Sequence, residues 1–227
     1  MNPAEILTWT KIHKKELTSK ILADANLTPS EHPIAIFMAG LPGAGKTELS
    51  KNLALELGPN LFRLDMDEFA TKILNYTPEK ADLFRASASL LMNVLFSKTL
   101  KEKYNFIMDG TFGSPRAIEN IKRCLAHGYQ VQINYVHQDP KLAWQFTLAR
   151  EKIEHRSIKQ EGFIETYFKV ENNLKEAVQN PEISIDVVHK KLDNTIGTHI
   201  ENISKDELDR LFKTNYNIDK LKEYINE

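Results

Sequence analysis

The stretch "PIAIFMAGLPGAGKTELSKNLALEL", residues 33–57, decides the fold. Its apolar run at 34–39 predicts a short buried strand, and the segment 46–57 predicts a helix. Between them, "GLPGAGKT" fits the phosphate-binding pattern G-x-x-x-x-G-K-[ST]. A strand before the glycine-rich turn and a helix after it form the context that this pattern requires. We therefore expect a phosphate-binding loop at residues 40–47.

The chemistry of this loop follows from its residue types. Glycine permits backbone conformations that let consecutive N–H groups turn toward a phosphate, and the following helix adds its positive N-terminal end. Lys46 would place a cation on the transferred phosphate, and the Thr47 hydroxyl is suited to Mg²⁺. The expected nucleotide-binding residues are Gly40, Leu41, Pro42, Gly43, Ala44, Gly45, Lys46 and Thr47. ATP or GTP, with Mg²⁺, is the expected ligand.

Predicted strands alternate with predicted helices along the rest of the chain. The strands are expected at 34–39, 61–65, 105–109, 129–136 and 183–190. This alternation implies right-handed crossovers and an α/β fold: a doubly wound, mostly parallel five-stranded sheet with helices on both faces. We expect one domain over residues 1–227, with an N-terminal helix at about 3–24 and a C-terminal helical extension at about 205–225. The strand that ends at Asp109 should lie immediately beside the strand that leads into the phosphate loop.

The composition excludes several classes of protein. Thirty basic and 31 acidic side chains give a net charge of -1, which argues against a long nucleic-acid partner. No apolar run is long enough to span a bilayer. Cys124 is the single cysteine, so an internal disulfide cannot form. These features indicate a cytoplasmic globular protein.

The acids after the second and third predicted strands favour phosphoryl transfer. A GTPase switch would need Asp-x-x-Gly, whereas Asp109 is followed directly by Gly110. A small kinase must instead deprotonate an acceptor hydroxyl held against the γ-phosphate. "RLDMDEF" delivers Asp65 and Asp67 to the carboxyl edge of the sheet, beside the phosphate loop. One of them could accept the proton while the other holds water around Mg²⁺, and Asp109 could contact either the metal or the acceptor.

Two arginines are candidates for the phosphate charge. Arg150 and Arg156 lie near the end of a predicted helix and in the loop after it. Guanidinium groups there could clamp phosphates during transfer, and surface arginines are the alternative. A nucleotide-binding adaptor that has lost catalysis is the competing, non-enzymatic interpretation.

Together these motifs resemble the zeta-toxin family of bacterial P-loop kinases. The resemblance rests on "GLPGAGKT", "LDMDEF", "NFIMDGTF", "GYQVQINYV" and "LAREKIEHR", in the order of that family. It implies use of ATP-Mg or GTP-Mg to phosphorylate the 3′-hydroxyl of UDP-N-acetylglucosamine. It also implies a small antitoxin protein as a partner.

The resemblance assigns roles to particular residues. It implies catalytic roles for Lys46, Asp67, Arg150 and Arg156, with Asp67 as general base. The expected metal-binding residues are Thr47 and Asp65, and the expected acceptor-binding residues are Asp65, Asp67, Asp109 and Thr111.

The chain departs from the family pattern on the acceptor side. Ala70 stands where those toxins commonly carry a basic residue, Asp109 replaces a glutamate, and residues 112–114 read Phe-Gly-Ser instead of x-Arg-Thr. The acceptor could therefore be another hydroxyl compound, such as a nucleoside, a nucleotide, an antibiotic or a polynucleotide end.

Overall fold

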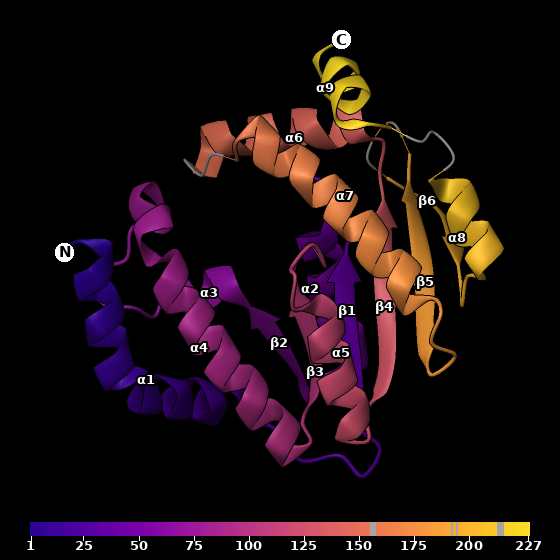
Figure 1. Cartoon of the computed structure of the whole chain (residues 1–227). Coiled ribbons are helices and arrows are strands. Elements are labelled where there is room, and N and C mark those ends of the chain that lie inside the picture. The colour runs from indigo at the N-terminus through magenta and orange to yellow at the C-terminus, as the bar shows by residue number, and fades with distance from the viewer. Residues whose placement is uncertain (155–157, 192, 194, 213–215) are drawn as a thin grey trace.

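The chain folds around one six-stranded sheet (Figure 1). The computed structural model describes residues 1–154, 158–191, 193, 195–212 and 216–227. Over these residues the strands are β1 (Ile34–Ala39), β2 (Leu61–Asp65), β3 (Asn105–Asp109), β4 (Gln130–His137), β5 (Ile183–Lys190) and β6 (Ile196–Ile200). They lie in the order β2-β3-β1-β4-β5-β6, and every neighbouring pair is parallel except β5 and β6. The predicted α/β sheet is confirmed, including the position of β3 directly beside β1.

Helices connect and cover the strands. They are α1 (Pro3–Ala25), α2 (Lys46–Leu57), α3 (Met66–Ala70), the 3₁₀ turn η1 (Pro78–Lys80), α4 (Ala81–Glu102), α5 (Ala117–Ala126), α6 (Pro140–Glu154), α7 (Gln160–Ala177), α8 (Lys205–Leu211) and α9 (Ile218–Asn226). Local sequence sets several of their ends: Asn2 and Glu5 form a capping box at α1, and Asn217 caps α9. None of the helices in the described residues is both long and apolar enough to cross a bilayer.

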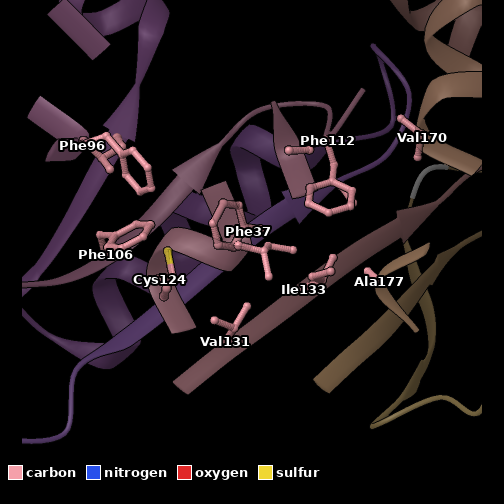
Figure 2. Close-up of a cluster of buried hydrophobic side chains, with 14 of the residues drawn as sticks. Phe37, Phe96, Phe106, Phe112, Cys124, Val131, Ile133, Val170 and Ala177 are labelled. Carbon is pink, nitrogen blue, oxygen red and sulfur yellow. The ribbon is translucent and has the colours of Figure 1, made fainter. Parts of the chain in front are cut away.

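The apolar core is divided between the two faces of the sheet because side chains alternate along β1. Phe37 packs in a cluster that includes residues of α4, α5 and α7, whereas Ile36 and Met38 pack in a second cluster with residues of α2 and α6. In the first cluster, Phe37 and Phe106 meet edge to face at 5.9 Å between ring centroids. Figure 2 shows this cluster, with Cys124 packed among the aromatic and aliphatic side chains.

The sheet has one strand more than the sequence predicted. Residues 196–200 form β6, which pairs antiparallel with the end of β5. This strand is short and mostly exposed, and it contains Gly197, so it lacks the apolar pattern that marks the five parallel strands.

The predicted C-terminal helix at 205–225 is also wrong in detail, because two helices lie there. Ser204 and Glu207 form a capping box at the start of α8, and Asn217 begins α9 with a separate cap. A second N-cap inside an amphipathic segment marks the start of a new helix. The predicted N-terminal helix is confirmed, one residue longer than expected.

We expect the replacement Phe106→Ala to destabilise the fold by about 3–5 kcal/mol, because Phe106 is fully buried between Phe37, Phe96 and Tyr129. Leu55→Ala is the matched control, since this α2 side chain is 81% exposed. Urea unfolding followed by circular dichroism measures both. Equal losses for the two variants would contradict the core assignment.

Candidate functional site

A cleft of about 1120 Å³ lies at the carboxyl edge of the sheet. Its walls come from the phosphate loop, the ends of β2 and β3, and parts of α4, α6 and α7. Carboxyl edges of parallel strands are where α/β proteins place their ligands. The predicted residues Gly43, Lys46, Thr47, Asp67 and Arg150 all line this cleft.

Close contacts with neighbouring backbone shape the phosphate loop. Gly40 and Gly43 have φ values of 136° and 78°, in the region that favours glycine. A Cβ atom on Gly40 would lie 2.6 Å from the Val136 carbonyl oxygen, and one on Gly43 would lie 2.2 Å from the Ala143 carbonyl oxygen. The Gly40 N–H also donates to the Thr111 carbonyl at 3.1 Å. The loop is therefore held in place by β4, α6 and the segment after β3.

The Lys46 side chain is buried at the base of the loop, where its Nζ donates to the Leu41 carbonyl oxygen at 2.5 Å. Burial lowers the pKa of Lys46 to about 8, the negative charge of Asp109 acts in the opposite direction, and the positive charge of Arg150 lowers it further. Arg150 thus lies close enough to influence the same ammonium. Lys46, Asp109 and Arg150 line the same cleft.

Asp65 ends β2 and caps the short helix α3. Its Oδ1 accepts hydrogen bonds from the backbone N–H groups of Asp67 and Glu68, at 2.8 and 3.4 Å. Burial raises the pKa of Asp65, the negative charge of Asp109 raises it further, and Arg63 acts in the opposite direction. This cap fixes the start of α3 and therefore the position of Asp67 in the cleft. Asp65 thus has a structural role in addition to any contact with metal.

Sequence reasoning missed Arg63, which joins the acids of the site. Its NH1 donates to Asp65 Oδ2 at 2.8 Å and to Asp109 Oδ2 at 2.7 Å, and its NH2 pairs with Glu68. The side chain is only 11% exposed. A detectable signal was present: a basic residue in the apolar strand "LFRLD", two positions before an acid and therefore on the same face of the strand.

Residues 109–112, at the end of β3 and after it, lie partly in the cleft and partly in the core. Asp109 Oδ2 also accepts a hydrogen bond from Ser50 Oγ at 2.7 Å, so this oxygen is held by both α2 and β2. Thr111 lines the cleft, and its Oγ1 accepts the N–H of Gly113. Phe112 has a φ of 64° and turns into the core, where it packs against Phe37 (Figure 2). Only part of this segment is available to a ligand.

A smaller lobe of about 320 Å³ extends the cleft toward α3 and α4. It shares Pro42, Asp67 and Arg85 with the main cleft, and Tyr76 and Glu79 line the lobe alone. A molecule in this lobe would therefore lie beside the phosphate loop and within reach of Asp67. The lobe fits a small second ligand.

The donor set fits Mg²⁺ in part. This cation commonly keeps several waters and takes one or two carboxylates together with substrate phosphates. Thr47, Asp65 and Asp67 line one cleft with the phosphate loop, which is a donor set of that kind. Both Asp65 oxygens already accept hydrogen bonds from the protein, so water-mediated contact suits this residue better than direct ligation. Arg156, the remaining predicted site residue, lies outside the described residues.

Comparisons with known proteins place the chain in a family. The sequence model of the zeta toxin family matches residues 18–205. Toxin PezT of Streptococcus pneumoniae is 27% identical over 129 residues, which are 53% of this chain and 51% of that toxin. The match thus spans about half the length of this curated relative.

Solved structures share the fold over a larger part of the chain. A structure from the PezAT chromosomal toxin–antitoxin system of Streptococcus pneumoniae superposes with a TM-score of 0.71 at 19% identity, covering 95% of this chain and 97% of the other. The AvrRxo1-ORF1:AvrRxo1-ORF2 structure gives a TM-score of 0.60 at 12% identity, covering 92% and 70%.

We expect Lys46→Met to stabilise the fold at pH 7. Lowering a lysine pKa from 10.5 to about 8 corresponds to a penalty of about 3 kcal/mol for the charged form. Removing the penalty stabilises the variant, and losing the hydrogen bond to the Leu41 carbonyl costs it about 1 kcal/mol. The free energy of unfolding should therefore rise by about 2 kcal/mol. Between about pH 8 and 10.5 the unfolded chain binds more protons than the folded chain, so wild-type stability rises there and the gain should shrink.

Urea unfolding at pH 7 and pH 10 tests this expectation, with the exposed α2 residue Lys51 as control in Lys51→Met. A Lys46→Met variant that is less stable than wild type at pH 7 would show that burial of the charged ammonium does not destabilise the fold.

We expect Arg63→Leu to destabilise the fold by about 3 kcal/mol at pH 7, because it leaves Asp65 and Asp109 close together without their shared cation. The pKa of Asp65, already raised, should rise further. A carboxyl group with a raised folded-state pKa favours folding below its unfolded pKa and loses that contribution as the pH rises through the folded value. The deficit should therefore shrink when the pH is lowered from 7 toward about 4.

Arg85→Leu is the matched control. Arg85 also pairs with an aspartate, but both side chains are more than two-thirds exposed, so its loss should change stability by less than about 1 kcal/mol. Thermal unfolding across this pH range measures both variants. A pH-independent deficit for Arg63→Leu would contradict the charge assignment.

Proposed function

Because this chain belongs to the zeta toxin family, we propose that it is a kinase that transfers the γ-phosphate of ATP or GTP to a hydroxyl group of a small molecule. One observation carries the proposal. The phosphate loop, the buried Lys46, Asp67 and Arg150 surround one cleft, and this cleft has an additional lobe beside Asp67.

The phosphate loop would bind the nucleotide. Backbone N–H groups of residues 40–47 and the start of α2 would hold the phosphates, and Lys46 would bind the transferred one. Thr47 with water held by Asp65 would bind Mg²⁺, which neutralises phosphate charge when bound. Arg150 would stabilise the charge that spreads over the transferred phosphoryl group. Its effect on the pKa of Lys46 supports this position.

Asp67 would be the general base. It would accept the proton of the acceptor hydroxyl while the hydroxyl oxygen forms a bond to the γ-phosphorus. The bond between this phosphorus and the bridging oxygen to the β-phosphate breaks, and the nucleoside diphosphate leaves with that electron pair. The Asp65 cap, which fixes the start of α3, would hold Asp67 in the orientation that this transfer requires.

The 320 Å³ lobe would hold the acceptor. UDP-N-acetylglucosamine is the acceptor that the family resemblance implies, and it is the first compound to test. Buried Ala70 lines the lobe where a basic residue is common in those toxins, and Phe112 faces the core. Another hydroxyl acceptor therefore belongs in the same experiment.

A small antitoxin protein is the proposed partner. The fold is similar to structures from the PezAT toxin–antitoxin system and the AvrRxo1-ORF1:AvrRxo1-ORF2 pair. Co-expression with a small protein encoded beside this chain would test the partnership.

Incubation with γ-labelled ATP or GTP tests the kinase function directly. One reaction contains UDP-N-acetylglucosamine and a second contains a small-molecule extract. We expect label on a small molecule, and Lys46→Ala should abolish its transfer. No turnover of bound nucleotide would favour the adaptor interpretation, and label found in inorganic phosphate alone would indicate hydrolysis without transfer to an acceptor.

We expect Asp67→Asn to lower kcat by about 10²–10⁴-fold while KM for nucleotide and thermal stability stay near wild type. Asp65→Asn should instead lower stability, because its carboxylate holds Arg63 and caps α3. Steady-state kinetics and thermal unfolding separate the two. If Asp65→Asn loses turnover and Asp67→Asn does not, the base is Asp65.

A further inference from the structure

A second lysine lies against the phosphate loop from another strand. Lys190 is the last residue of β5, and its side chain is only 7% exposed. A Cβ atom built on Gly45 would lie 3.3 Å from Lys190 Cε and 3.5 Å from Nζ. The ammonium therefore lies beside the loop at Gly45, the residue that caps the N-terminus of α2.

The protein provides the Lys190 ammonium with few groups that could balance its positive charge. Its nearest carboxylate oxygen in the described part of the chain is Glu48 Oε2, at 3.8 Å, which is too long for a hydrogen bond. Glu48 is 68% exposed, so water screens the pair. Within the described residues, Lys190 donates no side-chain hydrogen bond. A charge so far from water is unfavourable unless an anion satisfies it.

The edge strand holds Lys190 in place. Lys190 pairs with Ile196 of β6, and the next residue, Lys191, donates its N–H to the Thr195 carbonyl at 2.8 Å. Since β4 separates β5 from β1, the side chain must reach across the end of β4 to meet the loop. The antiparallel strand that the sequence did not predict thus fixes a cation beside the phosphate loop.

The position of the ammonium points to the inner phosphates of a nucleotide. Gly45 and Glu48 line the cleft and lie at the start of α2, and the backbone of a loop of this type holds the α- and β-phosphates. Lys46 serves the β- and γ-phosphates. A second ammonium at Gly45 would add a charge-assisted contact on the nucleoside side of the chain of phosphates.

We propose that Lys190 is a nucleotide-binding residue that pairs with the α- or β-phosphate, a role that rests on the proposed kinase function. The phosphate would replace Glu48 as the partner of the ammonium. Lys190 would then contribute affinity for nucleoside diphosphates and triphosphates alike, and none for a nucleoside.

Calorimetric titration of the full chain with Mg-ADP and with adenosine tests this role. Lys190→Met should weaken Mg-ADP binding by about tenfold or more, leave any adenosine binding unchanged, and fold at least as stably as wild type. Lys190→Arg, which keeps the charge, should retain most of the affinity. Lys191→Met, at the exposed neighbouring residue, should bind like wild type.

Glu48→Gln provides a second, independent readout. Removing this carboxylate takes a negative charge away from the phosphates and frees Lys190, so Mg-ADP should bind more tightly than to wild type. In combination with Lys190→Met the gain should be smaller, because only the first of these two effects remains.

Wild-type affinity in Lys190→Met would overturn the proposal, and so would weaker affinity in Lys190→Met accompanied by an equal loss in Lys190→Arg. In both cases the kinase assignment survives, because wild type still binds Mg-ADP. Absence of binding of both Mg-ADP and Mg-GDP by the wild-type chain would instead reject the proposed function itself.

Discussion

The burial of the Lys46 ammonium is the constraint on which the site depends. A cation at the base of the loop needs a nearby anion, and Asp109 at the end of β3 supplies it. Asp109 is held by Ser50 and by Arg63, and Arg63 also holds Asp65. Asp65 caps α3, the helix that carries Asp67. One series of contacts therefore links the phosphate loop to the proposed base across three adjacent strands.

Sequence alone predicted the parts of this arrangement that depend on local pattern. The strand–loop–helix from 34 to 57 and the positions of the five parallel strands along the chain follow from short apolar runs in the sequence. The placement of β3 beside β1 was predicted because an acid such as Asp109 at the end of a strand is typical of the strand beside a phosphate loop. Convergence of Asp65, Asp67 and Asp109 beside the phosphate loop could be expected because parallel strands present their carboxyl ends on the same side.

The features that the sequence did not predict depend on tertiary contacts. Arg63 can pair with Asp109 only because β2 and β3 lie side by side in the sheet. No local sequence pattern predicts this contact. β6 is defined by hydrogen bonds to β5 more than by its own residues, which are largely exposed. α8 and α9 are separate helices because each begins with its own N-cap residue. An amphipathic pattern of apolar residues does not reveal where one helix ends and the next begins.

The glycines at 40 and 43 carry a consequence for evolution. Their missing side chains are required by the carbonyl groups of Val136 and Ala143, which belong to the protein and not to a ligand. A descendant that gave up phosphate binding would still need both glycines for this packing, whereas Lys46, whose charged form is disfavoured by burial, could be replaced by an apolar residue. In homologous sequences, glycines kept at these positions therefore record an inherited architecture, and only the lysine beside them records continued selection for phosphate chemistry.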